Sequence, residues 1–297
     1  MASLRDFAKN VESPDFFRRL APGLHVGAPR PRLPTIAPSP TAPSTALEPW
    51  PLAGYLSLGP VLTPATAASL ASAVTALRAN AIHPSFLYVF DEAWDVLDAL
   101  RPLLAPFLGA DVQALADVWA WHVDPRIDRG GWLIHRGTYE EVRDGVGAPG
   151  LVNVWIALTD AGERNACMHV VPLDCDPHYP DDMKNLAGLE GRGIAVPTPA
   201  GSALAWNANV AHWGGTCDAS FSAPRISMSF TVRRCSHRDQ DLPVVRRPLS
   251  FRERLDLIAQ QFETYGEQEL DPAGNEMRWA EAVNGMRRVA RRFGSVV

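Results

Sequence analysis

The sequence predicts a mainly β fold: a double-stranded β-helix core (a jelly roll, cupin-like) with flanking N- and C-terminal helices. Three observations support this prediction. Between about residues 117 and 234, short apolar or alternating segments follow one another and are bounded by Gly, Pro and Asp. Segments with helical spacing lie before and after this region. Strands and helices do not alternate regularly along the chain, which disfavours a parallel α/β sheet.

The N-terminal part is expected to consist of an arm followed by helices. Residues 29–51 contain eight prolines and few charges, a composition that disfavours helices and central strands alike. Residues 1–50 are therefore interpreted as an N-terminal segment with a Pro-rich arm, in which residues 7–20 form a short docking helix. Residues 51–297 are interpreted as a single jelly-roll domain with its core at about 117–234.

Helices are predicted on both sides of the core. Thr63 is a suitable N-cap residue, and Pro64 is suited to the first helical position. A second helix is expected to begin near Asp91 and to end near Pro102 or Pro106, because proline removes a helix hydrogen bond. The remaining helices are expected in the C-terminal region 250–293, at 250–262 and 276–293.

The expected strands are rich in β-branched and aromatic residues, as is typical of strands. They are residues 118–123, 151–158, 168–171, 202–206 and 225–232. Residues 49–77 form the longest uncharged run, but Gly and Pro residues interrupt it. We interpret this run as a loop followed by an amphipathic helix, and not as a membrane span.

The composition disfavours several classes of function. The chain has 28 Lys+Arg and 33 Asp+Glu among 297 residues, and the resulting charge of -5 gives no sign of a nucleic-acid-binding protein. The four cysteines include no C-x-x-C pair, so neither a zinc ribbon nor a disulfide scaffold is indicated. No apolar leader follows a basic start. We expect a cytoplasmic protein with neither a nucleic-acid nor a membrane partner.

Two blocks late in the predicted core carry residues suited to binding a metal and an anion. His212 is followed by two nearby glycines, which let the backbone approach a ligand closely. Arg225 and Ser227 share one face of a predicted strand whose other face is apolar. A guanidinium group binds a carboxylate through two hydrogen bonds, so Arg225 could hold one end of a dicarboxylate that chelates a metal at His212. An internal ion pair between Arg225 and an acidic residue is the alternative.

Five blocks of sequence together resemble the phytanoyl-CoA dioxygenase family. They include Gly131-Trp132-x-x-His135-Arg136 and occur, in order, at 131–136, 152–161, 165–172, 201–215 and 224–227. Members of that family are mononuclear Fe(II), 2-oxoglutarate-dependent oxygenases on a jelly roll. The resemblance therefore implies Fe(II), 2-oxoglutarate and O2 as cofactors. It also implies that His135 and His212 bind iron and that Arg225 binds the C5 carboxylate of 2-oxoglutarate.

One position departs from the pattern of that family. Its His-x-Asp motif is replaced here by His135-Arg136-Gly137, so the carboxylate of the usual 2-His-1-carboxylate site is absent. A small anion, chloride or bromide, can fill the vacant position at Gly137 and restore the charge balance. The pattern is similar to that of the Fe(II)/2-oxoglutarate halogenases. This likeness implies halogenation of an unactivated aliphatic C–H bond by hydrogen-atom abstraction and halide rebound.

Further contacts with the cofactor and the substrate are expected from side chains in and beside the predicted strands. The expected cofactor contacts are Ser227, Asn153 and Trp155, and the expected substrate contacts are Trp119, Trp121 and Tyr139. The substrate is expected to be a small molecule, either free or attached to a carrier protein. No motif identifies it.

Three alternatives remain open. His122-Val-Asp124 could supply a complete His-x-Asp pair. The protein could instead be a hydroxylase or desaturase in which water, Asp124 or Asp160 completes the metal shell. The third alternative is a non-catalytic jelly-roll binding protein that has lost its metal, although the intact His212 and Arg225 argue against it.

Overall fold

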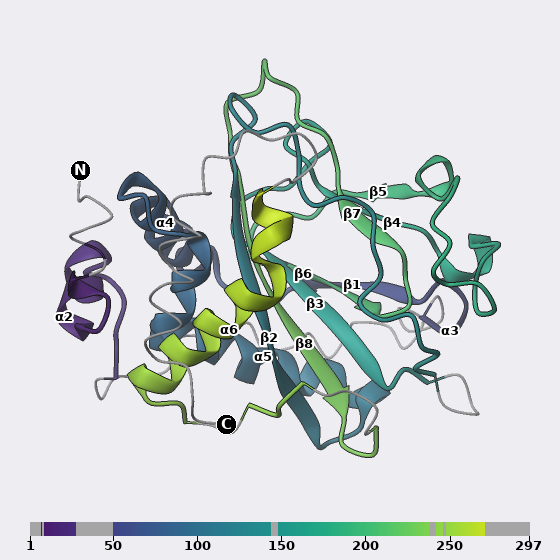
Figure 1. Ribbon diagram of the computed structural model, residues 1–297, viewed down its shortest axis with the longest axis horizontal. Coiled ribbons are helices and arrows are strands. Elements are labelled where there is room, and N and C mark those ends of the chain that lie inside the picture. The colour runs from purple at the N-terminus through teal and green to yellow at the C-terminus, as the bar shows by residue number, and fades with distance from the viewer. Residues whose placement is uncertain are drawn as a thin grey trace.

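Two antiparallel sheets form the centre of the molecule (Figure 1). A computed structural model describes residues 7, 9–27, 50–143, 148–237, 242–245 and 248–270. The larger sheet has the strand order β1-β6-β3-β8-β2, and the smaller has the order β5-β4-β7. The strands are β1 (Tyr55–Pro60), β2 (Val112–Val123), β3 (Leu151–Ala157), β4 (Met168–Val170), β5 (Ile194–Val196), β6 (Ser202–Asn207), β7 (His212–Gly214) and β8 (Arg225–Arg234). The prediction of a mainly antiparallel β fold with helices is confirmed.

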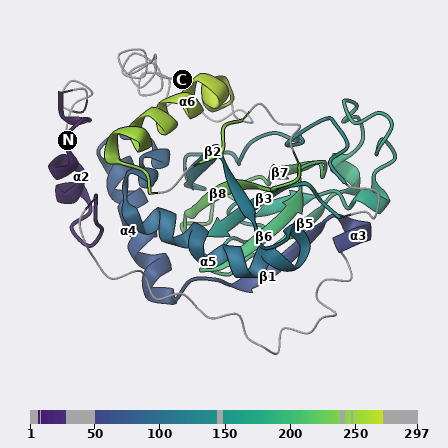
Figure 2. The same ribbon diagram turned by 90° about the horizontal axis from the view of Figure 1, so that it is seen from below.

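Helices cover one face and one edge of the larger sheet. They are α2 (Pro14–Leu20), α3 (Trp50–Ala53), α4 (Pro64–Ala79), α5 (Asp91–Leu108) and α6 (Phe251–Leu270), with short 3-10 turns η2 (Pro84–Val89), η3 (Leu173–Cys175) and η4 (Glu190–Arg192). Figures 1 and 2 both place α2 and α4 at the opposite end of the molecule from the smaller sheet. None of the helices in the described ranges is long and apolar enough to cross a membrane.

The boundaries of α4 and α5 test the predicted helix signals. Thr63 caps α4, because its side chain accepts a hydrogen bond from the backbone N–H of Thr66. Helix α5 begins at Asp91 as predicted, but its predicted end near Pro102 or Pro106 is wrong, since the helix runs through both prolines to Leu108. The reason is packing: Leu104 and Leu108 are fully buried against the core and keep the helix going.

Three strands were not predicted from the sequence. Strand β1 lies at residues interpreted as a loop; it is the edge of the sheet, and its register shifts between Ser57 and Gly59. An edge strand tolerates Pro60 at its end, because no second neighbour needs its N–H. Strands β5 and β7 have three residues each, too few to show a period. The predicted arm at 29–51 lies outside the described residues except at its end, where Trp50 and Pro51 begin the short helix α3, which was not predicted. The predicted helix at 276–293 also lies outside the described residues.

Alternation along β3 and β8 separates a helix-facing core from a polar face. Ile226, Met228 and Phe230 belong to the core that the helices share, as do Val152 and Val154 of β3. The residues between them point to the opposite face, towards the smaller sheet. The predicted division of β8 into an apolar face and a face that carries Arg225 is thus confirmed, and it places the polar face over a cavity.

Candidate active site

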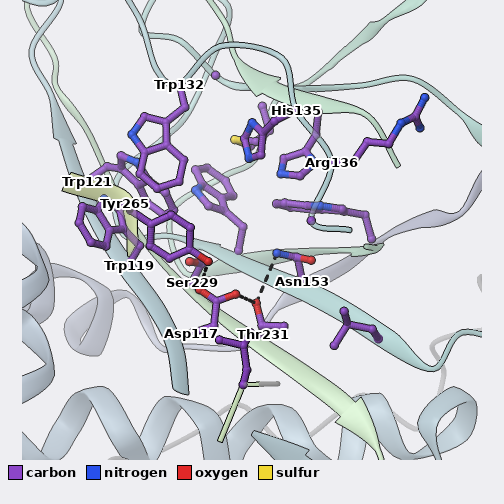
Figure 3. Close-up of a pocket in the computed structure, with 18 of the residues that line it drawn as sticks. Asp117, Trp119, Trp121, Trp132, His135, Arg136, Asn153, Ser229, Thr231 and Tyr265 are labelled. Carbon is purple, nitrogen blue, oxygen red and sulfur yellow. Dashed lines mark hydrogen bonds between the residues drawn. The ribbon is translucent and has the colours of Figure 1, made fainter. Parts of the chain in front are cut away.

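A cavity of about 260 Å³ lies between the two sheets. Every site residue expected from the sequence lines it except Ser227, which is buried beside Arg225 on β8. Asp117, Trp132, Thr231 and Tyr265 are among the lining residues that the sequence analysis did not assign to the site. Figure 3 shows Trp119, Trp121, Trp132 and Tyr265 grouped on one side, with His135 next to Trp132.

His135 and His212 face each other across an antiparallel bridge. The N–H of His135 donates to the carbonyl of His212 at 3.0 Å, and the N–H of His212 donates back at 2.9 Å. The centres of the two imidazole rings are 4.2 Å apart. The bridge therefore joins the segment that follows β2 to the start of β7, and it brings together two residues 77 positions apart in the sequence.

The second nitrogen of each ring fixes the tautomer. Nδ1 of His135 lies 2.7 Å from the carbonyl of Leu133, and Nδ1 of His212 lies 2.9 Å from the carbonyl of Val210. A carbonyl only accepts, so each Nδ1 carries the proton and each Nε2 keeps its lone pair. A backbone carbonyl at the far side of the ring is the usual support of a metal-binding histidine. This donor pair fits a divalent iron ion.

Two glycines allow the segments that carry His135 and His212 to approach each other closely. A Cβ atom on Gly131 would lie 2.7 Å from the Cα of Gly214 and 3.1 Å from Nη2 of Arg225. Only residues without a side chain let the two backbones meet there. The same contact brings the chain that carries His135 up against the arginine of β8.

Burial keeps both imidazoles neutral. It lowers the pKa of His135, and it lowers the pKa of His212 well below the usual range, with a smaller contribution from the neighbouring His135. Because protons compete with the metal, uptake of Co(II) is expected to stay constant from neutral pH down to 6.5, the ordinary histidine pKa, and to weaken only below it. The unfolded chain binds protons that the folded chain does not, so the metal-free protein should also lose stability below pH 6.5.

Titration of Co(II) absorption and urea unfolding at several pH values measure these two effects. A loss of metal uptake that begins already above neutral pH would contradict neutral imidazoles.

Arg225 is a buried cation without an acidic partner among the described residues. It is 1% exposed, its Nε makes no hydrogen bond, and its Nη1 donates only a long 3.5 Å bond to Ser227. The guanidinium also lies 5.7 Å from the ring centre of Trp155. Burial lowers the pKa of Arg225 to about 10. The alternative of an internal ion pair is therefore not formed within the described residues, and the cavity holds a fixed positive charge suited to a carboxylate.

Neighbouring side chains leave less space at Gly137 than the sequence suggested. A Cβ atom there would lie 2.9 Å from Oδ1 of Asn153 and 3.2 Å from the Cβ of Ala208. Oδ1 of Asn153 is buried and has no hydrogen-bond partner. The amide end of Asn153 thus borders the position that a carboxylate at residue 137 would use.

The acidic alternatives for a third ligand lie elsewhere. His122 contacts Arg78, and Asp124 forms an ion pair with Arg126 at 2.7 Å. Asp160 accepts a hydrogen bond from the N–H of Ala200. Within the described ranges, no group of three His, Cys, Asp or Glu residues could hold a metal ion. A complete His-x-Asp pair at 122–124 is therefore not formed.

Two polar side chains beside the site, those of Arg136 and Asn209, have a structural role. Arg136, the middle residue of the motif, forms a fully buried ion pair with Asp176 at 2.7 Å and donates to the carbonyl of Asn209. The side chain of Asn209 in turn accepts from the N–H of Val142 and donates to the carbonyl of Glu140. Together they hold the loop after Gly137 against the sheet.

One family model matches part of this chain. Residues 105–220 match the phytanoyl-CoA dioxygenase (PhyH) family model. This match includes both histidines and ends before Arg225, so the assignment of Arg225 depends on the cavity. A comparison with curated protein sequences found no match.

Solved structures show the same fold. AviO1 from Streptomyces viridochromogenes Tue57 is 20% identical, with a TM-score of 0.52 over 67% of this chain and 97% of its own. The nickel complex of the non-heme monooxygenase ThoJ is 17% identical, with a TM-score of 0.53 over 75% and 98%. The non-heme alpha ketoglutarate dependent epimerase SnoN, from nogalamycin biosynthesis, is 17% identical, with a TM-score of 0.50 over 71% and 98%.

Proposed function

We propose that this protein is a non-haem Fe(II)/2-oxoglutarate-dependent oxygenase with a jelly-roll core, within a single domain formed by residues 51–297. His135 and His212 would hold Fe(II) through Nε2, and Arg225 would hold the C5 carboxylate of 2-oxoglutarate. One observation carries the proposal: within the described residues, a buried arginine without an acidic partner shares a cavity with two imidazoles that keep a lone pair on Nε2. The matched family and the solved structures support it.

Iron, 2-oxoglutarate and O2 together supply an oxidant that removes a hydrogen atom from an unactivated C–H bond. The residues of this chain determine which bond is presented to it. The aromatic side of the cavity excludes water, and Trp132 lies against His135 with ring centres 5.9 Å apart. Its ring is therefore suited to position a small-molecule substrate, whether free or attached to a carrier protein, beside the metal.

We further propose that the reaction is halogenation, with chloride or bromide held beside Gly137. Two observations support this step: residue 137 has no side chain, and no acidic residue in the described part of the chain joins the two histidines. An anion at this position replaces the charge of the missing carboxylate. The neighbouring Asn153 side chain is neutral, so it does not itself replace the negative charge of the missing carboxylate.

A hydroxylase is the second candidate, and Asn153 favours it. Its buried Oδ1 has no hydrogen-bond partner and lies next to the position of a carboxylate at residue 137. In this candidate the amide oxygen takes the place of the missing carboxylate ligand, and no halide binds. Asn153→Ala would then weaken Fe(II) binding, whereas a halogenase would keep its metal.

Restoring the carboxylate is expected to abolish the response to halide. Fe(II) and 2-oxoglutarate are added to the protein without oxygen, and chloride is titrated while the visible charge-transfer band is recorded. The wild type should show a saturable shift of the band, bromide should shift it differently, and Gly137→Asp should show no shift because its carboxylate fills the halide position. Gly137→Ala is the matched control, since it meets the same crowding from Asn153 but offers no ligand.

Three results would count against halogenation. These are a wild-type band that ignores chloride, an unchanged chloride response in Gly137→Asp, and loss of Fe(II) binding in Asn153→Ala; the last would support the hydroxylase. A protein that binds neither Fe(II) nor 2-oxoglutarate would support the third alternative, a non-catalytic binding protein.

A further inference from the structure

A second charged group lies at the other end of the cavity from Arg225. Asp117 accepts a 2.5 Å hydrogen bond from the hydroxyl of Thr231 and a 2.9 Å bond from the hydroxyl of Tyr265 (Figure 3). Burial raises the pKa of Asp117, and these two hydrogen bonds oppose that rise. Among the described residues, no Lys, Arg or His side chain contacts this carboxylate.

Neither arginine that lines the cavity forms an ion pair with Asp117. Arg136 forms its ion pair with Asp176, and Figure 3 shows its side chain directed away from Asp117. Arg225 is six residues before Thr231 on β8, which corresponds to about 20 Å along a strand. A half-buried carboxylate that accepts only two hydrogen bonds is a favourable position for a cation. A cation that pairs with Asp117 would therefore have to come from outside the described residues.

Aromatic rings cover the space next to this carboxylate. Trp132 lies against Trp119, Trp121 and Tyr265, with ring centres 5.5, 5.4 and 5.6 Å apart. Three indole rings and a phenol beside an acid form the surroundings that bind organic cations, because the faces of the rings attract positive charge. Trp132 also contacts His135, so a molecule lying along these rings extends from Asp117 towards the candidate metal site.

We infer that this end of the cavity binds the protonated amine of the substrate, with the ammonium on Asp117 and the adjacent carbon chain along Trp119, Trp121 and Trp132. The substrate class is then an organic amine. This inference rests on the proposed function, in which the same molecule presents a C–H bond near His135 and His212. The cavity has two poles: Arg225 for the acidic cosubstrate and Asp117 for the basic substrate.

The test compares a charged and a neutral molecule of the same shape. Benzylamine and benzyl alcohol are titrated into the full chain loaded with Co(II) and 2-oxoglutarate, and the tryptophan fluorescence of the cavity reports binding. The wild type should bind benzylamine about tenfold more tightly than benzyl alcohol. Asp117→Asn should lose this preference, because it keeps the hydrogen-bonding shape but not the charge.

Asp124→Asn is the matched control, since Asp124 is an acid near the end of the same strand that pairs with Arg126 outside the cavity. It should keep the preference for the amine. Equal binding of the two probes by the wild type overturns the inference, even if Asp117→Asn fails to fold. Binding of neither probe by protein that has taken up Co(II), and an unchanged preference in Asp117→Asn, overturn it as well.

The absorption of bound Co(II), measured in the same samples, separates the two claims. Metal uptake without a preference for the amine contradicts only the substrate assignment. A preference for the amine without metal uptake contradicts the proposed function and leaves an amine-binding site.

Discussion

Replacing either His135 or His212 with alanine is expected to abolish the visible charge-transfer band that Fe(II) and 2-oxoglutarate give in the absence of oxygen. The cavity offers two imidazole ligands and no acidic residue that completes a trio within the described ranges. Losing one of two protein ligands leaves a single donor, which cannot retain the ion. Affinity for Co(II) should fall by more than ~100-fold, since even the loss of a supporting hydrogen bond to a ligand costs 10–100-fold.

His178→Ala is the matched control, because its imidazole lies in an exposed loop and contacts the carbonyl of Ala187. It should keep the band and the affinity for Co(II). Circular dichroism shows whether each variant is folded, so a lost band can be assigned to the missing ligand. A band of normal intensity in both His135→Ala and His212→Ala would place the metal elsewhere.

Arg225→Met is expected to make the ligand-free protein more stable while it loses its affinity for 2-oxoglutarate. The pKa of Arg225 falls from 12.5 to about 10 on burial, which corresponds to a destabilisation of roughly 3 kcal/mol at neutral pH. Methionine fills a similar volume without this charge, so the free energy of unfolding should rise by about 1–3 kcal/mol. The affinity for 2-oxoglutarate should fall by more than ~100-fold with the loss of a bidentate carboxylate contact.

Urea unfolding and titration of 2-oxoglutarate by calorimetry measure the two effects in the same variant. Arg164→Met provides the comparison, since Arg164 and its ion-pair partner Asp218 are both exposed. It should change neither quantity much. A less stable Arg225→Met protein that still binds 2-oxoglutarate would show that Arg225 has a structural role only.

The larger part of the fold was predictable because it depends on local periodicity. The two-residue alternation of β8 placed Arg225 opposite Ile226 and Met228, and the structure confirms that division. The signals of α4 were equally local, with Thr63 as its cap. Strand β7 has three residues and therefore no period; only its pairing with β4 makes it a strand.

The site residues that belong to sequence motifs were predicted, whereas those brought together only by packing were missed. The local sequence around His212 suggested a metal ligand, and the resemblance paired it with His135, because no local rule brings the two residues together. Asp117 could have been found, since it is two residues before Trp119 on β2 and so shares its face. Tyr265 could not, because it comes from α6, more than a hundred residues away from β2, and only the packing of that helix brings it to Asp117.

The cavity is lined by residues from the two sheets and by Tyr265 from helix α6. The imidazoles and the guanidinium belong to the antiparallel framework, whereas the phenol comes from a helix appended after it. Changes in α6 are expected to alter one wall of the cavity and to leave the candidate metal site in place. A change confined to this helix would therefore alter the aromatic wall without moving the two histidines or Arg225.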